Sequence, residues 1–481
     1  MTLRTRGAGA LLENGCKSLP GSARGEEADH FAIPPSTFPF SRFTVASSLS
    51  LLCISVSATI YSSGIEQLSN GYGVSIEVAT LGVSVYQLGF AFGPLVWGPL
   101  SELFGREAVF LATFSIFTLF TLGTALARDI SSMLVCRFFA GAFGSSILVI
   151  SAAIIGDLFD ASDRGPAMSF YLVAAFGGPI IGPLSGSFLA AATTYRWIFW
   201  LLTIFSGVSF LAGALVPETY SLVRLNRLAD KLTKTTGYIH RSAQAPATDV
   251  AIATTIRVSL IRPFQMLFQE GIVAFFAVYS GFIYGLLYGF FGAFPWIYHR
   301  ERGWSTGIAS LPFIAVGLGM LVAVGANLYL NKSYIAKTRA HGSQLPPESR
   351  LVLCCAGGIA LPIGLMIFAF TATPSVHWIG STVGGALFGF GFVGIFLSMT
   401  SYLLDTYAPL YSGSSLGSTA CIRSFAGAAF PLFIRQQLAG MTTQWTIFLY
   451  ACLAVAAAPV PFVLVRYGAH IRSGSKFASK D

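Results

Sequence analysis

Residues 351–372 read LVLCCAGGIALPIGLMIFAFTA, a run without a single charged side chain. About 20 apolar residues in a helix are enough to cross the hydrocarbon core of a bilayer. The rest of the 481-residue chain has the same character: 54% of its residues are hydrophobic, 10% are charged, and the mean hydropathy is +0.69. Typical soluble proteins carry about 25% charged residues. The sequence therefore predicts an all-α integral membrane protein.

Eleven further runs of this kind lie along the chain. The first six predicted spans are 44–64, 80–100, 107–127, 132–155, 167–190 and 197–216, and the second six are 271–292, 307–330, 351–372, 378–402, 414–434 and 444–466. We therefore expect one six-helix bundle at 44–216 and another at 271–466, joined by a basic linker at 217–270. Residues 1–43 are expected to form a disordered tail, and residues 467–481 a second tail.

Lysine and arginine are distributed unevenly between the two sides of these spans. With both termini in the cytoplasm, 22 of the 29 lie on the cytoplasmic side, four lie on the other side, and three lie in or at the ends of spans. Cytoplasmic loops of membrane proteins carry such an excess of positive charge. We therefore expect both termini in the cytoplasm, and we attribute the net charge of +9 to this bias rather than to a nucleic-acid surface.

Cysteine and histidine indicate no catalytic or metal centre. The seven cysteines are odd in number and irregular in spacing, and all six histidines fall in polar connections or tails. No Gly-x-x-x-x-Gly-Lys-Ser/Thr string is present to bind a nucleotide phosphate. The sequence predicts no cofactor, no metal and no enzymatic activity.

A short turn between the second and third predicted spans reads Gly98-Pro-Leu-Ser-Glu102-Leu-Phe-Gly105-Arg106-Glu107. Gly105 permits a tight turn, and Glu102 and Arg106 are four residues apart, a spacing that favours an ion pair at the helix ends. Such a pair would hold the two spans together. An ordinary charged loop is the alternative interpretation.

The fourth predicted span contains Arg137-Phe-Phe-Ala-Gly141. A guanidinium group inside an apolar run normally faces a polar interior, although a position near the boundary lets it extend to the interface instead. Both interpretations remain open. At the inner end of this span, Asp157 is expected to pair with Arg164 across a short loop.

Small residues recur every four positions along one face of the fifth predicted span: Ala174, Gly178, Gly182, Gly186 and Ala190. This spacing lets another helix approach very closely, and the flanking residues Pro179 and Pro183 can kink the span. A tight helix pair is the simplest interpretation.

Together these motifs resemble those of the major facilitator superfamily. The loop is similar to its signature Gly-x-Leu-x-Asp-x-x-Gly-Arg-Lys, with Glu102 in place of Asp and Glu107 in place of the basic residue. Arg137 and Gly141 match its Arg-x-x-x-Gly signature, and residues 178–186 match the antiporter signature of its drug:proton exchange branches. Stretches 217–220 and 423–431 resemble the fungal twelve-span drug:proton antiporters. The resemblance covers residues 40–467.

The resemblance implies two bundles that open a central cavity alternately to the two sides of the membrane. It implies export of a drug or secondary metabolite in exchange for protons, by a monomer in the plasma membrane, with the vacuolar membrane as the alternative. A conformational latch is assigned to Gly98, Glu102, Gly105 and Arg106. The glycine face of the fifth span is expected to seal the interface between the bundles.

Four residues are candidates for the cavity lining between the halves. They are Tyr86 and Gln87 of the second span and Tyr284 and Tyr288 of the seventh. An aromatic lining suits a hydrophobic or planar organic solute. Simple packing between helices is the alternative.

Acidic residues are absent from the centre of every predicted span. Proton-coupled carriers commonly use an intramembrane carboxyl group that titrates as its exposure changes. Here the candidates are Glu66, toward the outer surface, and Asp157, toward the inner one. The lack of central acids also argues against polycationic cargo.

Two other functions are considered. Import of a solute by facilitation or proton symport is disfavoured by the glycine–proline repeat of the fifth span, because importers of this superfamily generally lack it. A non-transporting receptor or a membrane enzyme is disfavoured by the lack of intramembrane histidine or paired acids and of a long soluble domain.

Overall fold

The computed structural model describes residues 42–159, 164–237, 252–341, 346–407, 409–475 and 477. The tail predicted at 1–43 falls outside these residues except for its last two. Every regular element in the described part of the chain is a helix. The predicted all-α fold is therefore confirmed.

The helices of the first half run from α3 to α10. Their bounds are α3 Arg42–Ile60, α4 Ile65–Tyr72, α5 Ile76–Phe104, α6 Arg106–Leu126, α7 Ile130–Gly144, α8 Ser146–Leu158, α9 Arg164–Ala192 and α10 Tyr195–Ala214. The second half runs from α13 to α18, with bounds α13 Gly271–Phe294, α14 Phe313–His341, α15 Val352–Thr371, α16 Trp378–Thr406, α17 Pro409–Ala457 and α18 Pro459–Ser473.

Within the described residues, eleven helical stretches are long and apolar enough to cross a membrane. The last of them, Gly413–Ser473, covers both the eleventh and the twelfth predicted spans. Thr442 interrupts it with a non-helical backbone, at φ 66° and ψ 157°. The chain therefore turns between two spans at this point, which accounts for all twelve.

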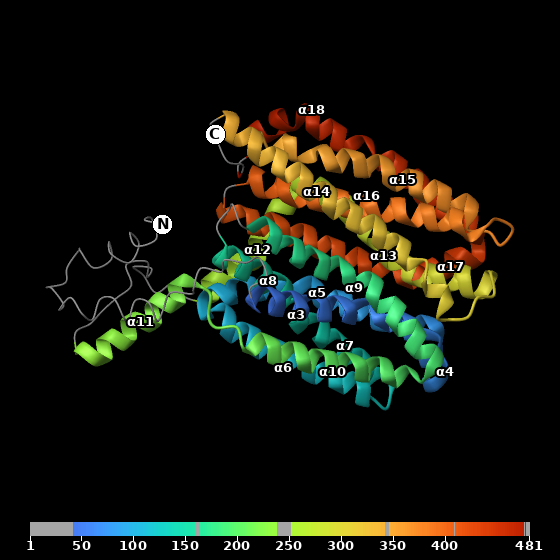
Figure 1. The fold of residues 1–481 in the computed structure, drawn as a ribbon, viewed down its shortest axis with the longest axis horizontal. Helices are drawn as coiled ribbons and strands as arrows, with labels where there is room; N and C mark the ends of the chain where they lie inside the picture. Colours follow the sequence, from blue (N-terminus) through green and yellow to red (C-terminus); the bar gives the residue numbers. More distant parts are fainter. Residues whose placement is uncertain are drawn as a thin grey trace.

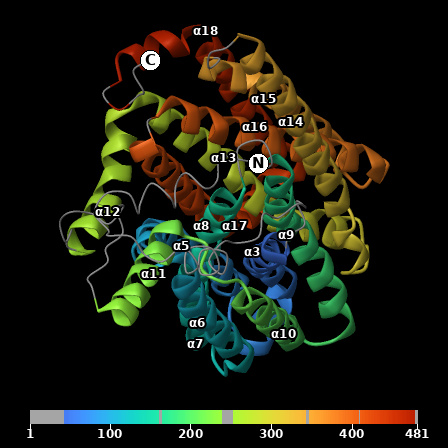
Figure 2. The same ribbon diagram turned by 60° about the vertical axis from the view of Figure 1, so that its left-hand side comes forward.

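The two halves lie side by side. In Figure 1 the blue-to-green helices α3–α10 form the lower part of the molecule and the yellow-to-red helices α13–α18 form the upper part. Figure 2 shows the same two groups from a different direction. Inside the halves, α3 packs on α9, α5 on α7, α13 on α17 and α15 on α16, while α5 against α17 and α9 against α14 join the halves.

Two helices lie in the segment predicted as a polar linker. Helix α11 spans Ser221–Thr236 and α12 spans Ile252–Gln269. No side chain of α11 is buried, and Figure 1 shows the helix extending away from the bundles. Helix α12 instead contacts α5 of the first half and α17 of the second. These two helices were not predicted, because the many lysines and arginines of the segment indicated a polar linker.

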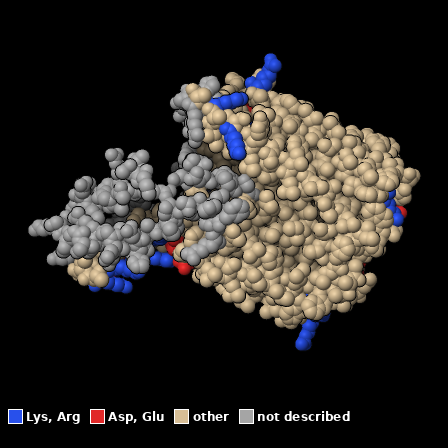
Figure 3. Space-filling model, in the orientation of Figure 1, with Lys and Arg blue, Asp and Glu red and all other residues tan. Residues whose placement is uncertain are grey.

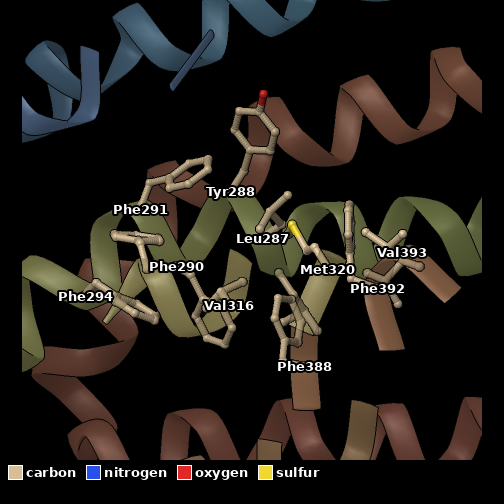
Figure 4. Close-up of a cluster of buried hydrophobic side chains, with 14 of the residues drawn as sticks. Leu287, Tyr288, Phe290, Phe291, Phe294, Val316, Met320, Phe388, Phe392 and Val393 are labelled. Carbon is tan, nitrogen blue, oxygen red and sulfur yellow. The ribbon is translucent and has the colours of Figure 1, made fainter. Parts of the chain in front are cut away.

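Aromatic side chains fill the core of the second half. Phe290 packs edge-on against Phe388, with their ring centroids 4.7 Å apart, and Phe294 stacks on Phe313 at 4.2 Å. Figure 4 shows this cluster between α13, α14 and α16. On the face shown in Figure 3, lysine, arginine and acidic atoms lie near the edges of the molecule, and a broad uncharged area separates them. That distribution fits a chain surrounded by lipid.

Glycine permits the closest helix contacts. A β-carbon on Gly89 of α5 would meet the backbone of Phe138 and Ala142 on α7, whereas one on Gly325 of α14 would meet open space. Helices with small residues at such crossings approach each other more closely than larger side chains allow.

Gly89→Ala is expected to destabilise the protein by about 1–3 kcal/mol, because α7 backbone occupies the space of the new methyl group. The melting temperature of the detergent-solubilised protein measures this effect. Gly325→Ala is the matched control, and it is expected to stabilise by about 0.5–1 kcal/mol by restricting the unfolded chain. Equal melting temperatures for the two variants would contradict the close contact.

Candidate functional site

The loop between α5 and α6 does not form the ion pair predicted from its sequence. Gly105 adopts φ +96°, which ends α5 and starts α6, so Glu102 and Arg106 do not share one helix and the four-residue spacing does not align them. Glu102 is exposed. Arg106 is buried, its Nε lies 3.5 Å from the carboxylate of Asp157, and its Nη1 donates a hydrogen bond to the Ser101 hydroxyl.

Glu218 completes this inner network. Its carboxylate accepts hydrogen bonds from the backbone N–H groups of Arg106 at 3.0 Å, Glu107 at 3.3 Å and Tyr220 at 2.9 Å. A negative charge at the start of α6 is favourable because the first N–H groups of a helix have no partner within it. The same carboxylate occupies the space that a β-carbon on Gly105 would need.

Glu218 lies in the stretch 217–220 that resembles the fungal twelve-span antiporters, but the sequence alone did not predict this role. The sequence feature that could have indicated the role is a single acidic residue directly after the predicted span 197–216. Tyr220 follows it outside the spans, where burial raises the pKa of its phenol and the guanidinium of Arg106 lies 4.9 Å from its ring centroid. Asp157 also accepts a hydrogen bond from Thr219 at 3.4 Å. The side chain of Arg164, its predicted partner, lies outside the described residues.

The fourth residue of the predicted latch, Gly98, lies inside α5. A β-carbon there would make an ordinary contact with Val149 at 3.7 Å. Arg106, Asp157 and Glu218 therefore join α6, α8 and the segment after α10 at one end of the first half, and the predicted latch role stays a prediction.

The glycine face of α9 packs against α3 of the same half, not against the other half as expected. β-carbons on Gly178, Gly182 and Gly186 would collide with Ser55, Thr59 and Ile60. The reason is a matching polar stripe on the preceding helices, which sequence analysis missed. It also recurs every four residues: Ser55, Thr59, Ser63 and Gln67.

This stripe donates hydrogen bonds to the backbone of α9. Ser55 donates to the carbonyl of Ala175 at 2.7 Å, Thr59 to that of Gly178 at 3.0 Å, and Ser63 to that of Pro183 at 3.0 Å. Pro179 has no N–H group, so the carbonyl four residues earlier, that of Ala175, loses its partner within the helix. Ser55 supplies the missing donor. The antiporter-like signature thus forms an α3–α9 ladder inside the first half.

The other side of α9 faces the second half. Gly317 and Gly307 leave room for the side chains of Ile180 and Phe188. Phe176 meets the ring of Phe396 on α16 edge-on, with the centroids 5.4 Å apart. These apolar contacts, rather than the glycines of α9, form this part of the interface between the halves.

Arg137 lies in the interior and does not extend to the interface. It exposes 2% of its surface, its Nε donates to the carbonyl of Gly82 at 3.2 Å, and its Nη1 donates to that of Ser57 at 2.9 Å. The rings of Tyr61 and Tyr86 lie 4.9 and 4.3 Å from its guanidinium carbon. Arg137 therefore ties α3, α5 and α7 together. Gly141, one turn on, makes room for the backbone of Tyr86.

The four predicted cavity residues lie on α5 and α13, and all of them except Tyr284 are buried. The rings of Tyr284 and Tyr288 are 4.9 Å apart, and Figure 4 shows Tyr288 pointing away from the aromatic core toward the blue helices of the first half. Tyr86 is fully buried, and its hydroxyl donates to the carbonyl of Ile54 within the first half at 3.1 Å. Gln87 is 1% exposed, and its side-chain oxygen has no partner among the described residues.

Arg423 is a further residue of this region that was not predicted from the sequence. This residue of α17 places its guanidinium carbon 5.2 Å from the ring centroid of Tyr284 and 4.7 Å from that of Phe396. The sequence does contain an indication of its importance, because Arg423 interrupts an apolar run as Arg137 does. Arg423 thus belongs to the same central cluster.

A cavity of about 90 Å³ lies at the opposite end of the molecule from the Arg106 network. Residues of both halves line it, including Glu66, Gln67, His299, Phe313 and Arg435. Glu66 and Arg435 form an ion pair across the halves at 3.1 Å. The two acids predicted for proton coupling, Glu66 and Asp157, are therefore both paired with arginine, one at each end of the first half.

Ser55→Ala is expected to lower the free energy of unfolding by about 0.5–2 kcal/mol, because the carbonyl of Ala175 then lacks a donor in an apolar environment. Melting temperatures in detergent test this. Ser185→Ala is the control on α9, since that hydroxyl bonds only its own helix, to the carbonyls of Ile181 and Gly182. A loss in Ser185→Ala as large as in Ser55→Ala would disprove the α3–α9 ladder.

Comparison with known proteins places this geometry in a family. The family model described as Major Facilitator Superfamily matches residues 47–431. The chain is 40% identical over 440 residues to "Efflux pump FUB11" of Gibberella moniliformis, covering 91% of this chain and 74% of that protein. It is also 40% identical to "Major facilitator superfamily multidrug transporter mdrA" of Aspergillus fumigatus, covering 91% and 72%.

Solved structures share the fold. The inward-open xylose transporter XylE from E. coli matches with a TM-score of 0.62 and 16% identity, covering 88% of this chain and 96% of that one. The human organic anion transporter MFSD10 matches with a TM-score of 0.57 and 17% identity, covering 88% and 99%. The chain is a multi-pass membrane protein that belongs to the major facilitator superfamily.

Proposed function

We propose that this protein is a secondary active transporter that exports small, largely hydrophobic organic molecules in exchange for protons. The observation that carries the proposal is the pair of Tyr284 and Tyr288 on α13, with Tyr288 directed toward the helices of the first half. Transporters built of paired repeats bind their solutes at this position. The names of the relatives, efflux pump and multidrug transporter, support export as the direction.

Alternating access requires contacts that hold the halves together on one side and then release them. On the outer side, the Glu66–Arg435 pair links the halves, and Phe188 inserts beside Gly307. Glu66 exposes 56% of its side chain, so water screens its ion pair and little energy is needed to separate it.

Proton coupling has a physical route through this pair. A proton taken up by Glu66 from the outer side would cancel its charge and release Arg435, which favours separation of the halves there. The Arg106–Asp157 pair lies at the inner end, where it joins α6 to α8 within the first half. A proton moving from one acid to the other would couple its passage to the two latches in turn.

We also propose the membrane arrangement that the charge distribution favours. Residues 44–216 and 271–466 form the two bundles, 217–270 connects them in the cytoplasm, and both tails are cytoplasmic. The plasma membrane is the expected location and a monomer the expected state. The excess of lysine and arginine on one side of the spans supports the orientation.

Export is tested by deleting the gene and comparing metabolites inside and outside the producing cells. The deletion strain is expected to retain at least one organic compound that the parent releases, and the intact gene is expected to restore its release. Unchanged metabolite distribution in the deletion strain would refute export.

Gly182→Leu is expected to abolish that release while the protein still reaches the membrane, because the new side chain would meet Thr59 and the backbone of Ile60 on α3. Immunoblots of membrane fractions and the export assay measure the two quantities. Gly207→Leu on α10, where a β-carbon would meet open space, is the matched control and is expected to retain export. Normal export by Gly182→Leu would remove this interface from the mechanism.

Reporter fusions at both ends of the chain test the orientation. Both reporters are expected on the cytoplasmic face, and the sequon Asn331-Lys-Ser333 is expected to stay unglycosylated because it lies on that face. A glycan on Asn331, or reporters on opposite faces, would overturn the arrangement.

A further inference from the structure

Arg423 is a buried charge in the middle of a membrane-spanning helix. It exposes 8% of its surface and lies within the eleventh predicted span, 414–434. The rings of Tyr284 on α13 and Phe396 on α16 flank its guanidinium group. The ring of Phe396 also meets that of Phe176 on α9 of the first half, with the centroids 5.4 Å apart. The group therefore lies where the two halves meet.

Other buried arginines of the described chain have hydrogen-bond acceptors. Arg106 has Asp157, and Arg137 has two backbone carbonyls. In contrast, Arg423 makes no hydrogen bond or ion pair with any described residue, and its Nε is buried without a partner. A guanidinium carries five N–H donors, and an aromatic face accepts none of them in the plane of the group.

No acidic side chain of the described residues forms an ion pair with Arg423. The rings beside its guanidinium group, those of Tyr284 and Phe396, carry no net charge. A second buried guanidinium group, that of Arg137, has its Nη2 without a partner among the described residues. Two guanidinium charges thus lie in the interior of the molecule, and no predicted span has an acid near its centre. In a region of low dielectric constant, uncompensated positive charge attracts an anion strongly.

We propose that the exported molecule is an organic anion, and that Arg423 binds its carboxylate or sulfonate group while Tyr284 and Phe396 contact its planar body. The inference rests on the proposed export function, because it names the class of molecule exported. An anion would supply the acceptors that Arg423 lacks and cancel its charge. The planar guanidinium fork matches the two oxygens of a carboxylate, which a lysine would not match.

Binding to the purified full-length protein tests this site. Naphthalene-2-carboxylate and naphthalene-2-sulfonate are the anionic probes, and naphthalene-2-carboxamide, with the same rings and no charge, is the neutral one. Calorimetric titration is expected to show the wild type binding the anions at least about tenfold more tightly than the amide, as charge-assisted bidentate hydrogen bonds predict.

Three variants separate the role of the charge from packing. Arg423→Met is expected to weaken anion binding at least about tenfold and to change amide binding by less than about twofold, because only the anion uses the fork. Arg423→Lys keeps the charge and is expected to lie between the two. Arg466→Met is the control, since Arg466 is an exposed arginine 5.9 Å from the ring of Tyr467 on α18, and it is expected to bind like the wild type.

The melting temperature without probe supplies a second readout. Arg423→Met is expected to melt at a higher temperature than the wild type, because it removes an uncompensated buried charge. A residue with a purely structural role would show the opposite change. Equal wild-type affinity for the acids and the amide, or lower stability with unchanged anion binding in Arg423→Met, would overturn the inference.

The test also distinguishes this inference from the proposed export. Phosphatidylcholine vesicles, which contain no anionic lipid, provide a membrane for a transport assay under an imposed pH gradient. Protein that binds naphthalene-2-carboxylate through Arg423 but moves no solute in them would contradict export and leave the anion site standing. Transport of the amide alone, unaffected by Arg423→Met, would support export and refute the anion site.

Discussion

Hydrocarbon offers no hydrogen-bond partners, so each polar group within the membrane must be satisfied by the protein itself. This constraint explains the α3–α9 ladder. Pro179 deprives the carbonyl of Ala175 of its helical partner, and Ser55 of the neighbouring helix replaces it at 2.7 Å. Such a bond requires close backbones, and Gly178 provides the space. Proline, glycine and serine on two helices are therefore parts of one solution to one physical problem.

The same constraint determines where charges lie. Ion pairs gather at the ends of the helices, as in Glu66–Arg435 and Arg106–Asp157. Arg137 is deep and obtains two carbonyls and two aromatic rings. Arg423 is equally deep and has rings alone. A departure from a rule that the neighbouring arginine obeys points to a ligand rather than to a structural role.

Composition was sufficient to predict the fold, because a span needs only length and apolarity. All twelve predicted spans coincide with helices, and a kink at Thr442 separates the last two. The side-chain partners of the charged residues were harder to predict. The four-residue spacing suggested Glu102 for Arg106, but Gly105 breaks the helix between them, and the actual partners come from α8 and from Glu218 beyond α10. Periodicity describes one helix, whereas these contacts depend on how different helices meet.

The prediction that the glycine face of α9 seals the interface between the halves was wrong for the same reason. Its actual position against α3 bears on the mechanism. Hydroxyl-to-carbonyl bonds and glycine contacts fix α9 on α3 within one half. Contacts between the halves include ring edges such as Phe176 on Phe396, with Ser84 to the carbonyl of Ala428 as a polar link. Apolar surfaces slide past each other without losing directional bonds, whereas the ladder resists separation. The first half is therefore built to move as a rigid body against the second, which is the form of motion that alternating access requires.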